Sequence, residues 1–334
     1  MSHTGTGSPT ARDIDWPALL ADIREHVAPR VGEGRVADYI PALACVPADR
    51  FGMAVVTVHG EVHAVGDAAE AFSVQSIAKV YSLTLALNAL GPALWERVGR
   101  EPSGNSFNSL VQLERERGIP RNPFINAGAL VLADVLLEAH GERAGEVFLD
   151  FVRERAGNPD IAYDPEVAAS EREHGHRNAA MVNFMRSFDN IHGDVEAVLD
   201  LYFMQCSLRM DCRDLARSVL YLADRGHCPH SGSAVVGAER AKRINAVMLT
   251  CGTYDAAGDF AFHVGLPAKS GVGGGIVAVI PKVAAVAVWS PALDEKGNSL
   301  AGGIALERLA EITALSVFCA ARRSVLLCSL PCRG

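Results

Sequence analysis

The chain has 334 residues, of which 49% are hydrophobic and 21% charged, so it can form one large globular domain or two ordinary ones. Its formal net charge of -8 argues against a protein that coats nucleic acid or an anionic membrane, because both need clustered positive charge. The eight cysteines are too sparse for a disulfide scaffold and are expected to stay thiols. Small-molecule chemistry is therefore the favoured class of function.

The first elements in chain order are a lead-in, a helix and a strand pair. Residues 1–14 lack the basic and apolar regions of a secretory signal, so we expect a disordered lead-in and a cytoplasmic protein. Apolar residues at 19, 20, 23 and 27 predict a helix over 16–29. Segments 52–58 and 61–65 flank His59-Gly60 and predict two strands joined by a tight turn.

The pattern then changes to helices and returns to strands. Five segments with a helical period are expected between residues 74 and 224: 74–90, 126–140, 176–188, 194–209 and 212–224. Three β-rich segments separated by Gly and Pro follow: 260–264, 274–280 and 284–289. A final helix is predicted over 303–321.

Strands at both ends with helices between them predict an α+β fold whose sheet is discontinuous in sequence. We expect one domain over 15–320, with a mainly antiparallel sheet, flanking helices and an inserted helical lobe. The sheet lobe comes from about 15–70 and 235–320, and the helical lobe from about 71–234. A cleft between the lobes is the natural place for an active site. The tail, 321–334, has no assigned role.

Ser76 and Lys79 are the first candidates for chemistry. They stand at i and i+3 near the start of a predicted helix, so both project from nearly the same face. Burial among apolar neighbours would lower the pKa of the lysine amine and let it take the serine proton. The pair alone is weak evidence, because a Ser-x-x-Lys match arises about once by chance in a chain of this size.

The second candidate is the glycine-rich segment 267–276, which contains Lys269 and Ser270 and runs into a strand. Glycines allow backbone amides to approach a ligand closely, as an oxyanion hole requires. The order of residues fits neither a phosphate loop nor a dinucleotide fingerprint. A plain glycine-rich turn stays open as the alternative.

Two tyrosines and two histidine pairs complete the candidates. Tyr202 and Tyr254 could relay protons near a serine and lysine, or be ordinary half-buried aromatics. The pairs His174/His176 and His227/His230 lack the partners of a zinc motif, so no metal is expected. Segment 172–177 is interpreted as a solvated loop.

Taken together, these residues resemble the serine-dependent glutaminases over roughly residues 15–320. Eight blocks occur in the family's order: Tyr39–Ala44, Phe72–Lys79, Asn122–Ala129, Ser170-Glu171, Arg177-Asn178, Tyr202 with Gln205–Ser207, Cys251–Tyr254 and Lys269–Gly275. Ala78 departs from the pattern, since the family often has serine there, and 321–334 fits no block.

The resemblance implies a fold related to the serine β-lactamases and penicillin-binding proteins. It implies hydrolysis of L-glutamine to glutamate and ammonia, without metal or organic cofactor. It also implies a nucleophile, Ser76, and a base, Lys79. Which of Lys79, Tyr202 and Tyr254 carries each proton stays open. The implied substrate shell is Tyr39, Gln75, Ser76, Asn126, Glu171, Asn178, Tyr202, Tyr254 and Val272.

Two other functions stay open at this point. A penicillin-recognising hydrolase or esterase would share Ser-x-x-Lys and Lys-Ser-Gly but would not need Glu171 to hold an ammonium group. A silent glutamine-binding module would not need Ser76 and Lys79. We expect no nucleic-acid or membrane partner, and we expect a homo-oligomer, either a dimer or a tetramer.

Overall fold

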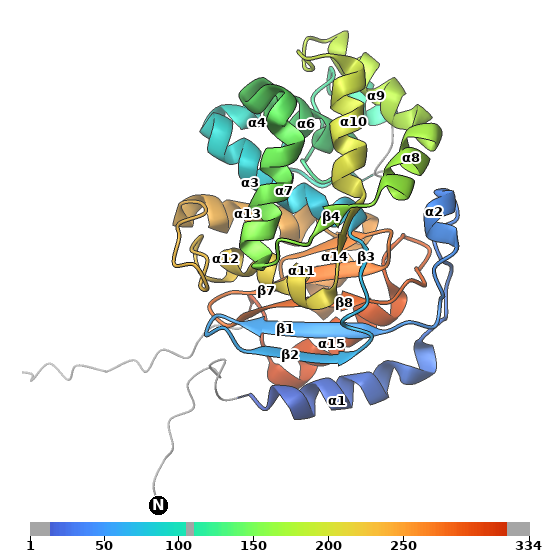
Figure 1. The fold of residues 1–334 in the computed structure, drawn as a ribbon, viewed down its shortest axis with the longest axis vertical. Helices are drawn as coiled ribbons and strands as arrows, with labels where there is room; N and C mark the ends of the chain where they lie inside the picture. Colours follow the sequence, from blue (N-terminus) through green and yellow to red (C-terminus); the bar gives the residue numbers. More distant parts are fainter. Residues whose placement is uncertain (1–13, 105–109, 319–334) are drawn as a thin grey trace, which may run out of the picture.

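The computed structural model describes residues 14–104 and 110–318, and its core is a five-stranded antiparallel sheet built from both ends of the chain (Figure 1). The strands lie in the order β2-β1-β8-β7-β6. Their bounds are β1 (Gly52–Thr57), β2 (Val62–Gly66), β6 (Ala268–Gly271), β7 (Gly275–Ile280) and β8 (Ala284–Trp289). N-terminal β1 pairs with C-terminal β8, which confirms the discontinuous sheet and the α+β class.

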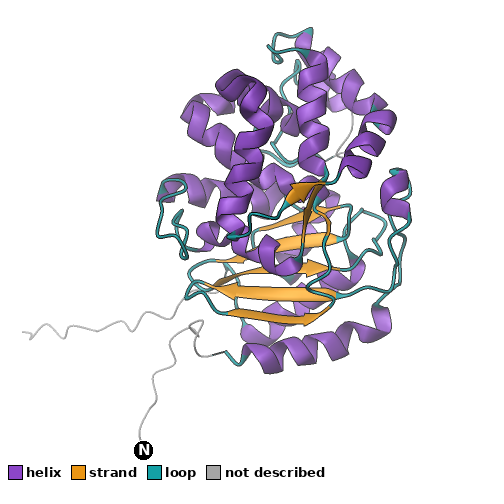
Figure 2. Ribbon diagram, in the orientation of Figure 1, coloured by secondary structure: helices purple, strands orange, loops and turns teal. Residues whose placement is uncertain are grey.

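Two terminal helices cover one face of this sheet. They are α1 (Trp16–Val27), capped by the Asp15 side chain, and α15 (Leu300–Thr313), capped by Ser299. Both helices contribute to one apolar cluster with the residues of β1, β7 and β8 that point to their side. Figure 2 shows the two helices together beneath the strands. The helix and the strand pair predicted at the start of the chain are confirmed.

The opposite face of the sheet carries helices from the second half of the chain. These are α11 (Cys212–Ser218), α12 (Leu220–Ala223) and α13 (Ala238–Cys251). The short α14 (Ala257–His263) follows α13 and packs through Phe260 on the apolar cluster of α1 and α15. Because helices lie on both faces, β1, β7 and β8 are buried along their whole length. This explains their nearly continuous apolar sequences, which do not alternate between apolar and polar residues.

A lobe of helices stands above the sheet in Figure 1. Its members are α3 (Lys79–Leu90), α4 (Leu94–Arg97), α5 (Leu110–Arg115), α6 (Asn126–His140), α7 (Ala144–Ala156), α8 (Pro165–His174), α9 (His176–Arg186) and α10 (Val195–Cys206). A small sheet, β3 (Phe72–Ser73), β5 (Leu208–Met210) and β4 (Ala162–Tyr163), joins this lobe to the rest. The short helix α2 (Pro41–Ala44) lies at the edge, beside α8.

Several predicted elements differ from the structure. Segment 260–264 is not a strand, because Phe260 packs on the core while Phe262 is 85% exposed at the end of α14. The last helix begins at Leu300 and ends at Thr313, where Ala314 adopts a left-handed backbone conformation. Segment 212–224 is two helices, and 194–209 stops at Cys206 so that β5 can pair with β3.

Other expectations concern the whole chain. Residues 1–13 of the lead-in and the tail 321–334 lie outside the described residues. The cysteines of the described part, Cys45, Cys206, Cys212, Cys228 and Cys251, are free thiols as expected. One helical run in this part, Gln75–Arg97, is long and apolar enough to cross a membrane, but 67% of that window is buried inside the fold, as in a core helix.

Candidate active site

A polar cavity of about 550 Å³ lies where α8, α9 and α10 of the helical lobe meet the turn between β6 and β7. This volume suits a small molecule. Eight of the ten predicted site residues line it: Tyr39, Gln75, Ser76, Asn126, Glu171, Asn178, Tyr202 and Val272. The other two do not line the cavity. Lys79 lies one helical turn after Ser76, and Tyr254 contacts Ser76 from outside the cavity.

Ser76 lies in a short 3₁₀ helix, η3 (Gln75–Ala78), that runs directly into α3. Side chains three residues apart eclipse in a 3₁₀ turn, which brings the Ser76 and Lys79 side chains to one side. The residue before the serine, Gln75, has φ of +51°, a left-handed conformation that is costly for a residue with a side chain. The segment thus presents Ser76 at a strained turn into a helix.

Lys79 is almost fully buried, and its ammonium is held by protein oxygens. Nζ donates to Asn126 Oδ1 at 2.7 Å and to the Phe124 carbonyl at 3.3 Å. Burial lowers the pKa of Lys79 to about 8, against the opposing effects of Cys206 and Glu171. A sizeable fraction of this amine is therefore neutral and able to accept a proton near pH 8.

Tyr254 contacts Ser76 from a different cavity. Its phenol is hydrogen-bonded to Ser76, and burial is the main cause that raises its pKa. The ring lines a neighbouring cavity of about 780 Å³, together with Phe124 and Cys251. The structure therefore places Tyr254 at Ser76 but outside the cavity that the other predicted substrate residues share.

The far wall of the cavity carries one buried carboxylate. Glu171, on α8, is 8% exposed, and burial raises its pKa to about 7, although a hydrogen bond from Gln75 and the charges of Lys79 and His174 lower it. Nearby, Asn126 Nδ2 donates to Asn178 Oδ1 at 3.1 Å, which links α6 to α9. These groups offer one anion and several amide donors to a bound molecule.

The glycine-rich turn between β6 and β7 packs directly on the backbone before Ser76. A Cβ added to Gly271 would lie 2.4 Å from the Val74 oxygen, and one added to Gly273 would lie 2.2 Å from the Ser73 oxygen. Both distances exclude a side chain, so these glycines are required for the close approach. Val272, between them, is brought into the same cavity as Ser76.

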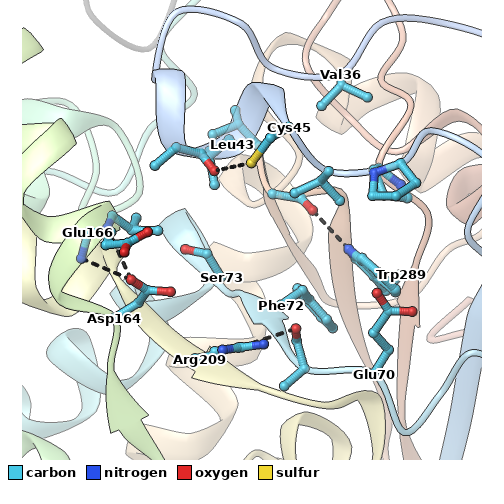
Figure 3. A pocket seen from close by; sticks show the side chains of 18 residues that line it. Val36, Leu43, Cys45, Glu70, Phe72, Ser73, Asp164, Glu166, Arg209 and Trp289 are labelled. Atoms are coloured by element: carbon cyan, nitrogen blue, oxygen red, sulfur yellow. Dashed lines mark hydrogen bonds between the residues drawn. The ribbon is translucent and has the colours of Figure 1, made fainter.

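A second, smaller cavity of about 310 Å³ adjoins the first and shares Val272 (Figure 3). Phe72, Ser73 and Trp289 belong to its wall. Ser73 Oγ donates to the Cys206 carbonyl at 3.0 Å and accepts from Gln75 Nε2 at 3.1 Å. This hydrogen-bonded pair separates the two cavities and holds the Gln75 carboxamide beside Glu171.

The sequence interpretation missed one part of the wall. Segment 172–177 is not a solvated loop but the junction of α8 and α9, and His174, His176 and Arg177 line the cavity. Asp164 at the N-cap of α8, followed by Pro165, was the signal that a helix begins there. The structure thus adds groups that can carry positive charge to the cavity that contains Glu171.

The His and carboxylate cluster with metal-ligand spacing in the described residues lies away from this cavity. It consists of Asp134, Glu138 and His192. Asp134 is fully buried and pairs with Arg97, which also pairs with Glu138, and the backbone amides of residues 192 and 193 donate to Asp134. A guanidinium and two amides already occupy these oxygens, so the cluster reads as a structural network.

An α+β fold of this arrangement, with a serine at the start of a helix in a cavity between sheet and helical lobe, defines a β-lactamase-like hydrolase class. The glutaminase family model matches residues 34–318. The glutaminase of Rhizobium leguminosarum bv. trifolii is 58% identical over 306 residues, which are 91% of this chain and 99% of that protein.

Solved structures agree with the sequence relatives. The probable glutaminase ybaS has a TM-score of 0.85 and 35% identity, covering 91% of this chain and 99% of that one. The Bacillus subtilis glutaminase YbgJ, in its covalent complex with 5-oxo-L-norleucine, has a TM-score of 0.81 and 35% identity, covering 90% and 99%. The chain therefore belongs to the glutaminase family, the enzymes that hydrolyse glutamine (EC 3.5.1.2).

Proposed function

We propose that this glutaminase acts through an acyl-enzyme on Ser76, with Lys79 as the base. The observation that carries the proposal is that Ser76 is the only serine or threonine among the described residues that line the cavity. The related YbgJ forms a covalent complex by reaction with 6-diazo-5-oxo-L-norleucine, which supports a nucleophilic mechanism in the family. The buried Lys79 supplies the neutral amine that such a nucleophile needs.

In this mechanism Ser76 Oγ attacks the side-chain amide carbon of glutamine. Its proton passes to Lys79, either directly or through the phenol of Tyr254 or Tyr202, and then to the leaving nitrogen, so the C–N bond breaks and ammonia departs. Water next attacks the γ-glutamyl ester, the ester C–O bond breaks, and the proton returns to Ser76. The net reaction converts glutamine and water to glutamate and ammonia.

The oxyanion formed in both steps needs donors. We assign this role to the backbone amides of Ser76 and Val272, because Gly271 and Gly273 bring the turn against residues 73 and 74. Such donors act in a dry site and need no reorganisation during the reaction.

The rest of the cavity suits a zwitterionic amino acid. Glu171 can pair with the α-ammonium group. Asn178 uses its Oδ1 to accept from Asn126, which leaves its own amide hydrogens for the α-carboxylate. Tyr202, 4% exposed, and Tyr39, 53% exposed at the mouth, add phenol donors. These contacts favour glutamine as the amide substrate.

The test is ammonia release by purified Ser76→Ala protein, with Ser187→Ala as the surface control. We expect no measurable ammonia from Ser76→Ala and the normal rate from the control. 6-diazo-5-oxo-L-norleucine should add its mass to the wild type and not to Ser76→Ala. Normal turnover by Ser76→Ala would disprove the proposal.

A further inference from the structure

Lys269 is a second buried lysine near the nucleophile that the proposed mechanism does not use. It lies on β6 and pairs in register with Val277, which faces the helical lobe. Its side chain is completely buried. The neighbours whose charge acts on it in the described structure are Lys79, Cys206 and Cys251, with no carboxylate among them. A buried amine without an anion costs stability and calls for an explanation.

Two carbonyl oxygens and one aromatic ring surround Lys269 Nζ. Nζ donates to the Gly252 carbonyl at 3.0 Å and to the Ser270 carbonyl at 2.5 Å. It lies 4.5 Å from the centre of the Tyr254 ring, within the range of a cation–π contact. Burial and the charge of Lys79 lower the pKa of Lys269 well below its usual value, and even the neutral amine has the two hydrogens that these two carbonyls accept.

The same contacts hold Tyr254 in place. Its backbone has φ of +54°, a strained conformation for a residue with a side chain. The Ser270 amide donates to Gly252 O at 3.0 Å, and the Tyr254 hydroxyl donates to Ser270 O at 3.2 Å. Lys269 therefore binds the two carbonyls that join the turn 251–254 to β6, and it also supports the ring of Tyr254.

The hydrogen-bond directions extend this chain to the nucleophile. A phenol has one hydrogen, and a carbonyl can only accept, so Tyr254 donates to Ser270 O and accepts the hydrogen bond of Ser76. Any shift of the ring changes the direction in which the Ser76 hydroxyl points.

We propose that Lys269 is a positioning residue that holds Tyr254 in its strained conformation, so that the phenol oxygen accepts the hydrogen bond of Ser76 and fixes the direction of the Ser76 hydroxyl. The inference rests on the proposed role of Ser76. It assigns to Lys269 an effect on the chemical step and none on glutamine binding, because Lys269 does not line the substrate cavity.

Lys269→Met is the informative substitution, since methionine is apolar and of similar length. Neither carbonyl loses its last donor, because Gly252 O keeps the Ser270 amide and Ser270 O keeps the Tyr254 hydroxyl. The substitution also removes a buried polar amine whose charged form has no anion beside it. We therefore expect a melting temperature equal to or above that of the wild type, together with a kcat about a hundredfold lower and a KM within about twofold.

A double-mutant cycle with Tyr254→Phe tests whether Lys269 acts through the phenol. Phenylalanine keeps the ring and removes the hydroxyl, so Lys269→Met should cost less than about threefold in kcat in that background. Lys242→Met, an exposed lysine on α13, is the control and should behave as wild type.

Each outcome has a clear reading. A Lys269→Met protein with normal kcat overturns the inference, and so does one that unfolds, since that reports a structural role. Equal losses in both backgrounds also overturn it, because they separate Lys269 from the phenol. An active Ser76→Ala protein would instead overturn the proposed function, so the two failures are distinguishable.

Discussion

At the scale of single residues, Lys79 and Glu171 both have pKa values near neutrality, and both must be deprotonated for the proposed reaction. Burial raises the pKa of Glu171 to about 7 and lowers that of Lys79 to about 8. As the pH falls below about 7 a growing fraction of the Glu171 carboxyl is neutral and cannot pair with the α-ammonium, and as it falls below about 8 a growing fraction of the Lys79 amine is protonated and cannot accept a proton. Both effects reduce activity in acid.

We therefore predict that kcat/KM for glutamine rises from pH 6 to pH 9. The logarithmic slope should approach 2 below about pH 7 and 1 between about 7 and 8, because two groups titrate in turn. Steady-state kinetics over this range with constant ionic strength measures the slopes. In Glu171→Gln the slope should be 1 at every pH below about 8; a second titration that survives in this variant would contradict the assignment.

Glu171 also provides a prediction about binding. Glu171→Gln removes the charge that we assign to the α-ammonium group, and a hydrogen bond between charged groups contributes about 1.5–3 kcal/mol. KM for glutamine should rise about tenfold to a hundredfold. The matched control is Glu173→Gln, an exposed carboxylate on the same helix, which should leave KM unchanged. A normal KM in Glu171→Gln would place the ammonium elsewhere.

At the scale of elements, the turn between β6 and β7 functions through its close packing on β3. A methyl group at Gly271 would meet the Val74 oxygen, so the turn would have to move away from Ser76. We predict that Gly271→Ala lowers kcat at least about a hundredfold, as expected when an oxyanion donor is displaced. Ammonia assays and thermal melts on the same samples separate this loss from unfolding.

Gly303 is the matched control for that substitution. It lies inside α15, and nothing is within 4 Å of an added Cβ. Alanine there should raise the free energy of unfolding by about 0.5–1 kcal/mol, because it limits the unfolded chain and favours helix. Catalysis should not change. Equal losses of activity in both glycine variants would contradict a specific role for the turn.

Some helices and strands could be predicted from the sequence, and others could not. The α1 stripe and the β1–β2 turn depend on neighbours in sequence, and they were predicted correctly. Segment 260–264 has aromatic residues typical of a strand, but it lies largely in helix α14. Its structure depends on tertiary packing, which the local sequence does not show. Strand β5 was hidden at the end of a helix because its partner β3 lies more than 130 residues earlier.

The candidate site shows the same division. Ordered motifs brought Ser76, Glu171 and Asn178 to attention, and the structure places them in one cavity. Motifs could not show that Tyr254 faces another cavity, or that Lys79 is held by a backbone carbonyl of residue 124, because these contacts join distant segments. Lys269 was named in the sequence only as part of the glycine-rich segment 267–276, and its hydrogen-bond partners required coordinates.

At the scale of the whole molecule, the cavity joins the helical lobe to the turn of the main sheet. A ligand there stabilises the native state in proportion to its occupancy, and a concentration one hundred times Kd adds about 2.7 kcal/mol. We predict that L-glutamate raises the melting temperature of the wild type and of Ser76→Ala, but much less that of Glu171→Gln. D-glutamate serves as control, and an equal shift with it would indicate a nonspecific effect.

The pairing of β1 with β8 has a consequence for how the chain is made. Thr57 and its partner Ala284 are 227 residues apart. A ribosome adding about 5–20 residues per second needs roughly 10–50 seconds to produce that partner. Throughout this interval the edge of β1 that β8 will cover lacks its hydrogen-bonding partner, and an apolar strand in that state invites pairing with another chain. Yield in cells should therefore depend on elongation speed and on chaperones that shield the nascent hairpin.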